Sequence, residues 1–371
     1  MEQQFKEWVE FIVSDYEIPN PLTNDWIAGE LNALNKNDGY NLFMLWGFCY
    51  RDLRKHDLHQ LDKNLLLKVP FNTNTLWPKY LPKGFDPEAI INSKPLSYGF
   101  REVHKQGITG KGILVAVVDF PSNMNHQEVC KQVKEYIILD EKYNVSHFHG
   151  LAVLSHLCGK TIGIAPDVDV IFYGGQPYGG STKEEKHNIV GSYGINCLKD
   201  IKKQILNGKP IRIVNMSNSW LYYGSDELKH EASQLRNELE SLGCVVIDSP
   251  KFFENYRYLD CKADEDYQNI DNYQIPPFFD VDEKNRMNFL SGGTLCASYL
   301  TTNGYEFSPV GSASYTIPQL VGFYSLALQI KPQLTFNEFV SICQENALVN
   351  KANIKVVDPI KTLERIKNGN K

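Results

Sequence analysis

The sequence predicts an α/β fold with a mainly parallel central sheet, preceded by a helical N-terminal region. From about residue 96 onward, segments with helical periodicity alternate with short apolar segments, an order typical of helices packed on a parallel sheet. Residues 113–118 and 243–247 are almost entirely apolar, as strands buried on both faces usually are. The chain has 371 residues, which is enough for one large domain and a smaller one.

Composition and charge argue against several classes of function. Apolar residues make up 42% of the chain, enough for a sizeable core. The net charge is −6 with the two signs interspersed, so we expect no nucleic-acid surface. No run approaches the ~20 apolar residues that span a membrane, and the N-terminus lacks the basic and apolar segments of a secretory signal.

The cysteines indicate a reducing compartment. There are eight, they are scattered, and none forms a C-x-x-C pair, so we expect neither a zinc knuckle nor a redox motif. Several lie in apolar segments and are expected to be buried free thiols. We therefore expect a soluble, cytoplasmic protein.

Residues 1–95 are predicted to form the helical N-terminal region. Three stretches have helical character: residues 2–15, a second helix opening at Asn20 and Pro21, and the aromatic-rich stretch 41–67. A loop rich in proline and asparagine follows at residues 70–87. The region could be a packed extension, a module that docks a partner or a regulatory segment, and the sequence leaves these alternatives open.

The first strand of the α/β part ends in an acid. A helix over residues 100–106 precedes the apolar strand 113–118, which runs directly into Asp119. In open α/β sheets, functional sites lie beyond the carboxyl ends of the strands. Asp119 is therefore a candidate functional residue, and the alternative is an aspartate that caps a loop.

Two histidines precede the next helix. His149 stands at the start of an apolar helix predicted over residues 150–157, and His147 lies two residues earlier. Their spacing raises the alternative of a metal site, but no cysteine or carboxylate cluster nearby completes one. We expect neither a metal nor a cofactor.

The alternation then continues along the chain. A tight turn over residues 162–166 leads into a strand at 168–173, and a second buried strand covers 211–216. Helices are predicted over 187–206 and 225–242, and a further strand over 243–247. The polar and aromatic stretch 248–290 has no clear period, and no element is assigned to it.

A polar loop runs into a buried helix between residues 310 and 330. Small residues precede Ser314, and the apolar run that follows is too long for a strand. Pro318 should lie in the first turn, where its missing N–H costs nothing, which places Ser314 at the helix N-terminus. A serine there is either an N-cap or a nucleophile whose oxyanion faces the free N–H groups of the helix.

Four segments, in this order, resemble the subtilisin-like serine peptidases (subtilases). The order Asp, His, Ser on elements of the right type makes the resemblance specific. It covers roughly residues 100–345 and implies a three-layer subtilisin-like fold over residues 96–371. The segments are residues 107–119 with His126 seven residues on, His149–Gly150 with the turn 163–166, residues 214–217, and residues 314–318 with Val321 and Gly322.

The resemblance implies an activity and roles for three residues. Ser314 would attack a peptide carbonyl, His149 would act as general base and then acid, and Asp119 would orient His149. The expected function is therefore a serine endopeptidase that works through an acyl-enzyme intermediate. His147 is the rival base, but Gly150 directly after His149 fits the family spacing.

The resemblance also implies a substrate cleft. A protein or peptide substrate would lie extended against the edge of residues 211–217, with Ser217, Asn218 and Ser219 bordering the pocket before the cut. Asn255 is the candidate for the side chain that helps to hold the oxyanion. The calcium loop of secreted subtilisins is expected to be absent, because no acidic insert follows His149.

Departures from the family pattern support a second hypothesis. Phe120–Pro121 replaces the small residue and glycine after the aspartate, and Leu151–Ala152 and Ser312–Ala313 replace other flanking residues. No alanine-rich segment with an asparagine follows residues 243–247. The alternative is therefore a pseudoprotease that binds peptides without efficient turnover. The G-x-S-x-G signature and residue order of α/β-hydrolases are both missing.

Overall fold

The computed structural model describes residues 17–32, 43, 46–276, 287–290, 295–309 and 312–369. The helix expected over residues 2–15 lies outside these residues, as do Val310 and Gly311. None of the helices in the described ranges has the length and apolar character needed to cross a membrane.

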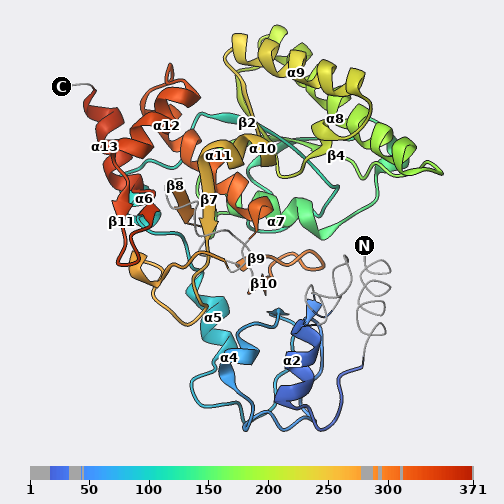
Figure 1. Ribbon diagram of the computed structural model, residues 1–371, viewed down its shortest axis with the longest axis vertical. Helices are drawn as coiled ribbons and strands as arrows, with labels where there is room; N and C mark the ends of the chain where they lie inside the picture. Colours follow the sequence, from blue (N-terminus) through green and yellow to red (C-terminus); the bar gives the residue numbers. More distant parts are fainter. Residues whose placement is uncertain are drawn as a thin grey trace.

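A five-stranded parallel sheet forms the centre of the α/β part (Figure 1). Every pairing between its neighbouring strands is parallel. The first of these strands along the chain lies in the middle of the sheet. Its carboxyl end is therefore at the centre of one sheet edge, where ligands of such sheets bind. In spatial order the strands are β3 (Val133–Ile137), β4 (Asp169–Gly174), β2 (Leu114–Asp119), β5 (Ile211–Met216) and β6 (Val245–Asp248).

The α/β part has three layers, a sheet with helices on each face, and the alternation of side chains along the strands explains them. Val115 and Val117 of β2 belong to the core shared with α7 (Phe148–Cys158) and α11 (Ala313–Ile330). Ala116 and Val118 point to the opposite face, where α8 (Lys183–Leu206) and α9 (Asp226–Ser241) cover the sheet. Successive strand side chains point to opposite faces, so an entirely apolar strand requires helices on both. The α/β fold with a parallel central sheet is confirmed.

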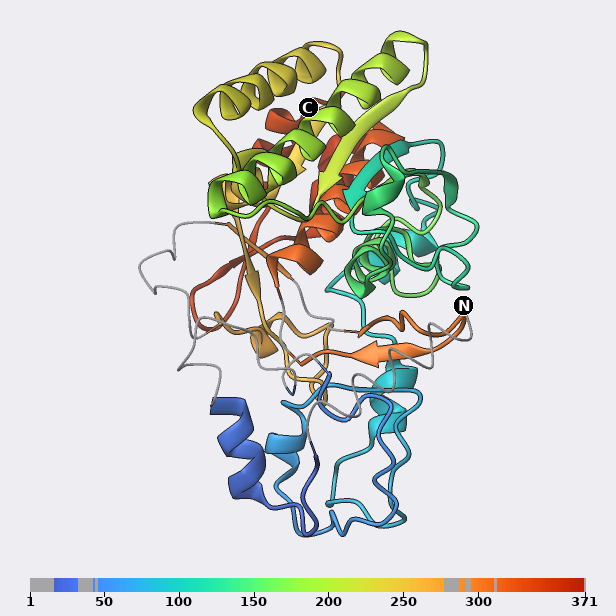
Figure 2. The same cartoon turned by 90° about the vertical axis from the view of Figure 1, so that its right-hand side faces the viewer.

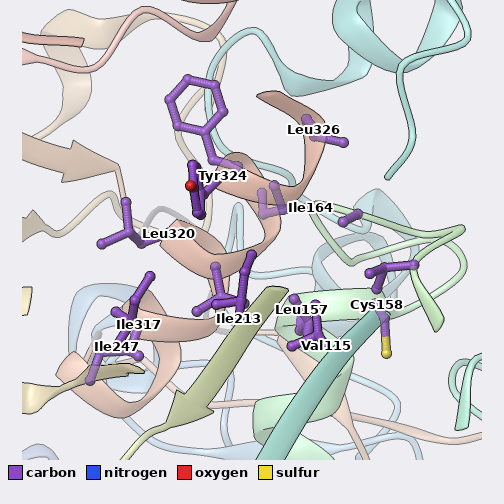
Figure 3. Packing of buried hydrophobic residues seen from close by; sticks show 14 of the residues in the cluster. Val115, Leu157, Cys158, Ile164, Ile213, Ile247, Ile317, Leu320, Tyr324 and Leu326 are labelled. Carbon is purple, nitrogen blue, oxygen red and sulfur yellow. The ribbon is translucent and has the colours of Figure 1, made fainter. Parts of the chain in front are cut away.

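Two helices cover the face of the sheet that carries the larger core. Residues of α7, α11 and the strands meet there. In Figure 3, Leu157 of α7 lies beside Val115 of β2, and Ile317 of α11 lies beside Ile247 of β6. Gly322 of α11 packs against the turn that follows α7, and a Cβ on it would lie 2.8 Å from the Cβ of Ile164. Helix α11 can therefore approach this turn closely only while position 322 has no side chain.

The N-terminal region joins the α/β part through a small sheet. Its described helices are α2 (Asn24–Asn32), α4 (Lys63–Leu66) and α5 (Pro87–Ser93), at the lower end of Figure 1. Strand β1 (Phe71–Asn72) pairs with β10 (Tyr305–Phe307), which pairs with β9 (Leu295–Ala297), both antiparallel. Figure 2 shows the orange β9–β10 segment between the blue N-terminal elements and the rest. One hydrophobic core contains side chains of the N-terminal elements together with side chains of β9 and β10.

The stretch 248–290, left unassigned from sequence, contains several short elements. Helix α10 (Ser249–Asn255) follows β6 directly, and β7 (Tyr256–Leu259) pairs in parallel with β8 (Met287–Leu290). These strands belong to a second sheet with β11 (Leu348–Val349) and β12 (Lys355–Val356). The remaining α-helices are α6 (Phe100–Lys105), α12 (Phe336–Glu345) and α13 (Pro359–Asn368).

One expectation about helices holds only in part, since Phe43, Trp46 and α4 are helical within residues 41–67, and another is wrong. In the described part of residues 41–67, turns occupy most of the chain after Trp46, because Gly47 and Tyr50 adopt positive φ values of 40° and 62° that a helix does not allow. Pro318 lies inside α11 and beyond its first turn. Its missing N–H would have bonded to the carbonyl of Ser314, four residues earlier.

Replacing Gly322 with alanine should destabilise the protein by about 1–3 kcal/mol, because the added methyl group overpacks the contact with Ile164. The matched control is Gly29→Ala in α2, where nothing lies within 4 Å of the added carbon. That change should raise stability by about 0.5–1 kcal/mol. Urea unfolding of both variants measures the difference, and equal effects would contradict the close approach of α11 to this turn.

Candidate active site

Asp119 lies at the carboxyl end of the central strand, completely buried. The Phe120 backbone N–H donates to its Oδ1 at 2.8 Å, and its own carbonyl accepts from the N–H of Gly175 at 3.0 Å. Among the described residues, its other carboxylate oxygen, Oδ2, has no hydrogen-bond partner. A carboxylate buried in this way requires a positive partner.

His149 supplies that partner. It is the second residue of α7, and its Nδ1–H donates to Oδ1 of Asp119 at 2.6 Å. The His149 side chain is 15% exposed and the Asp119 side chain fully buried, so the pair is largely shielded from water. This geometry fixes the tautomer, with Nδ1 protonated and Nε2 free to accept a proton.

Gly150 lets the start of α7 approach the strand end. A Cβ on this glycine would lie 2.1 Å from the carbonyl oxygen of Phe120. No side chain can occupy that space, so the glycine after His149 is a requirement of the close approach between α7 and the residue after Asp119.

The charge on Asp119 sets the proton affinity of His149. Burial lowers the pKa of His149, but the negative charge of Asp119 and its hydrogen bond raise it by more, so the net shift is upward. His147 is different: burial and the neighbouring His149 lower its pKa to about 4, against a weaker opposing effect of Asp119. Its Nδ1 accepts from the His149 backbone N–H at 3.2 Å and caps α7. The low pKa and the capping hydrogen bond therefore favour a neutral, capping role for His147.

Aromatic rings enclose the imidazole. The Phe120 ring meets His149 edge to face, with ring centroids 5.6 Å apart, and also contacts the ring of Trp220 at 5.5 Å. It lies 4.7 Å from the His147 ring on another side. In the sequence, Phe120 stands out only as a departure from the family pattern. Its bulk directly after a candidate catalytic aspartate was a usable signal for a wall of the site.

Ser314 is the second residue of α11 and is half-buried. The N-cap of the helix is Ser312, whose hydroxyl accepts from the N–H of Tyr315 at 3.3 Å, so Ser314 does not have that role. The Ser314 hydroxyl donates to the carbonyl of Ser217 at 3.1 Å. Within the described residues, no hydrogen bond links Ser314 to His149.

Residues 217–219 follow β5 at the same sheet edge. The Asn218 side chain ties the ends of two strands together: its Nδ2 donates to the carbonyl of Val118 at 3.1 Å, and its Oδ1 accepts from the N–H of Trp220 at 3.1 Å. Ser217 is buried and Ser219 half-buried. Asp119, Ser217 and the Ser314 hydroxyl therefore converge on one edge of the sheet.

The expected position of an extended substrate needs correction. Strand β5 pairs with β2 on one side and with β6 on the other, so its edges are already occupied. A substrate strand cannot add along residues 211–216, because the backbone groups there are bonded within the sheet. The backbone leaves the sheet only after Met216, at residues 217–219, where the carbonyl of Ser217 accepts from the Ser314 hydroxyl.

Asn255 is the last residue of α10 and is half-buried. Within the described part of the chain, no hydrogen bond joins its side chain to Ser314 or to Ser217. The structure therefore brings Asp119 and His149 into contact and Ser314 into contact with Ser217, but it leaves Asn255 outside these contacts. Among the described residues, no group of three or more His, Cys, Asp or Glu side chains could hold a metal ion.

The histidines should titrate over separate ranges. We expect the pKa of His149 to lie above the ordinary value of 6.5, and those of His147 and buried His156 to lie at about 4. The difference arises because Asp119 stabilises the His149 imidazolium, whereas burial disfavours the charge on the others. NMR titration of ¹⁵N-histidine-labelled protein measures all three.

The control for this titration is Asp119→Asn. Without the carboxylate, burial alone should act on His149, so its pKa should fall below 6.5. An unchanged pKa in this variant would show that Asp119 does not govern the charge of His149.

Comparisons with known proteins give a distant structural likeness. No protein-family model and no curated protein matches the sequence. Among solved structures, the chain is similar to the PatG macrocyclase domain, with 12% identity and a TM-score of 0.49 over 74% of this chain and 96% of that one. It is similar to the prenylagaramide maturation protease PagA, with 15% identity and a TM-score of 0.48 over 73% and 99%. For the PatG macrocyclase in complex with peptide, the identity is 10% and the TM-score 0.49 over 74% and 97%.

Proposed function

We propose that the chain is a subtilisin-like serine endopeptidase, with Ser314 as nucleophile, His149 as general base and Asp119 as the residue that orients it. The main support is the buried Asp119–His149 hydrogen bond of 2.6 Å, which leaves Nε2 of His149 free and raises its pKa. The Ser314 hydroxyl at the same sheet edge, on the carbonyl of Ser217, adds to this support.

The reaction would pass through an acyl-enzyme. The Ser314 hydroxyl leaves the Ser217 carbonyl and turns to Nε2 of His149, which takes its proton as Oγ bonds to the substrate carbonyl carbon. His149 then gives that proton to the amine as the C–N bond breaks. A water molecule attacks the ester through the same histidine, which releases the acid and restores Ser314. Asp119 remains ionised and stabilises the imidazolium throughout.

The N-terminus of α11 would hold the negative charge of the intermediate. Ser314 lies in the first turn of α11, where backbone N–H groups have no partner within the helix and the helix dipole favours negative charge. We retain Asn255 as the proposed second donor, from the end of α10. Loss of one such donor costs about 10²–10³ in turnover, so an imperfect donor would slow the reaction without abolishing it.

A peptide-binding scaffold without efficient turnover is the second candidate. The Ser314 hydroxyl donates to a carbonyl oxygen at 3.1 Å, and Nε2 of His149 is not its acceptor. In the scaffold, Ser314 is a structural hydroxyl that supports residues 217–219, the proposed peptide-binding segment. The two candidates differ in whether Ser314 can be deprotonated by His149.

Labelling by a fluorophosphonate probe should separate the candidates. We expect covalent modification of Ser314, identified by peptide mapping, and loss of both labelling and peptide hydrolysis in Ser314→Ala. The matched control is Ser325→Ala, which removes the same hydroxyl from the same helix, where it donates to the carbonyl of Val321. In Ser325→Ala, the probe should still label Ser314. Peptide binding by wild-type protein that the probe does not label would favour the scaffold.

The triad should behave as one catalytic unit. Asp119→Asn should keep the fold and lower kcat/KM by ~10⁴, because the amide favours the wrong imidazole tautomer. His149→Ala should be comparably severe, and the double variant little worse than either single one. His147→Ala should cost far less, because the low pKa of His147 and its capping hydrogen bond give it a structural role. If the loss of kcat/KM in the double variant equals the product of the losses in Asp119→Asn and His149→Ala, the two residues act independently and the proposed triad is wrong.

A further inference from the structure

We propose that the N-terminal region positions the catalytic histidine. The turn formed by residues 46–50, called here the 46–50 turn, supports the beginning of α7, and Trp46 acts as a positioning residue for His149 through Phe148. The kinetic consequence of this proposal rests on the function proposed above. Its structural consequence, a change in the environment of the His149 imidazole, does not.

Trp46 lies against the residue that precedes His149. Trp46 is 3% exposed, and its ring meets the Phe148 ring edge to face, with centroids 5.2 Å apart. Phe148 is the first residue of α7, and its ring lies 4.4 Å from the ring of His147 and 6.3 Å from that of His149. A shift of Phe148 moves the backbone of both neighbours. The contact with Trp46 therefore restrains the segment that aims the imidazole at Asp119.

The 46–50 turn is firmly held within the N-terminal region. The Phe48 N–H donates to the carbonyl of Pro70 at 2.7 Å, and the Tyr50 N–H to Oδ1 of Asn72 at 3.2 Å. Gly47 has a φ of 40°, and a Cβ there would lie 2.6 Å from the same Pro70 carbonyl. Trp46 is thus attached to a tightly packed turn that cannot easily move away from Phe148.

A second set of contacts holds α7 farther along its length. The Tyr50 hydroxyl and the Ser298 hydroxyl are hydrogen-bonded at 2.8 Å. Ser298 directly follows β9, and the N–H of Ala297 in β9 donates to Oγ of Ser155, in the interior of α7, at 3.2 Å. Strand β1 of the N-terminal region continues this sheet through β10. The N-terminal region therefore contacts α7 directly at its start and through β9 at its middle.

These contacts bear on catalysis because His149 tolerates little displacement. Its hydrogen bond to Asp119 is 2.6 Å long, and the two residues come from different elements, α7 and β2. A displacement of about 1 Å in a catalytic group can cost ~10² in rate. A purely core-filling Trp46 would affect stability alone, whereas a positioning Trp46 would also change the titration of His149.

Three variants and two measurements test the proposal. Trp46→Ala removes the contact, and Trp46→Phe keeps an aromatic edge against Phe148. Trp26→Ala is the matched control, because Trp26 packs against Phe43 in the core of the N-terminal region, 5.2 Å between ring centroids. NMR titration of His149 is measured in the full chain, together with kcat and KM for a peptide substrate.

Trp46→Ala should lower kcat by ~10², leave KM within about twofold, and lower the pKa of His149 toward that of a histidine without its carboxylate partner. Trp46→Phe should restore most of kcat and most of the His149 pKa. Trp26→Ala should lower stability without changing kcat or the pKa of His149. If Trp46→Ala leaves kcat and the His149 titration as in Trp26→Ala, the positioning role is refuted.

The two proposals fail in distinguishable ways. If the chain is not a peptidase, wild type shows no hydrolysis, yet the His149 titration still moves in Trp46→Ala and not in Trp26→Ala. If only the positioning role is wrong, wild type hydrolyses peptide and Trp46→Ala matches the control. Should Trp46→Ala fail to fold, Trp46→Leu retains the apolar volume without the aromatic edge and is judged by the same two measurements.

Discussion

The hydrogen bond between Nδ1 of His149 and the buried carboxylate of Asp119 is the interaction on which the rest of the site depends. It explains why the central strand ends in an acid, since a carboxylate without exposure requires a positive partner. It also explains Gly150, because α7 reaches Asp119 only by passing within contact of the Phe120 carbonyl. Phe120 then closes one side of the pair against water. The fold thus holds the His149 imidazole, polarised by Asp119, at the sheet edge where Ser314 also lies.

Local patterns were sufficient to predict most of the α/β part. The strand ending at Asp119, the helix beginning beside His149 and the long apolar helix after Ser314 each carry their periodicity and their end signals within a few residues. The elements that sequence reasoning missed depend on distant partners. Strand β3 has an exposed middle and an irregular pattern, and β9 and β10 become strands by pairing with each other and with β1, more than two hundred residues away.

The site could be predicted only in part for the same reason. The types and order of Asp119, His149 and Ser314 indicated the roles proposed for them, whereas the hydrogen bond from the Ser314 hydroxyl to the Ser217 carbonyl depends on residues that are distant in the sequence. The helical pattern of residues 41–67 was misleading, because aromatic residues placed to contact Phe148 and the N-terminal core resemble an amphipathic stripe. Positive φ values at Gly47 and Tyr50 break that helix and create the turn that carries Trp46.

The pH dependence of Ser314 phosphonylation tests the central claim most directly. In this reaction the Ser314 oxygen bonds to phosphorus, fluoride leaves, and His149 takes the proton, so the rate follows the neutral imidazole. The rate should rise with pH through one ionisation above 6.5, because the Asp119 carboxylate raises the pKa of His149. In Asp119→Asn the rate should be lower at every pH. Labelling of Ser314 at a rate independent of pH, or unaffected by Asp119→Asn, would contradict a serine activated by the His149–Asp119 pair.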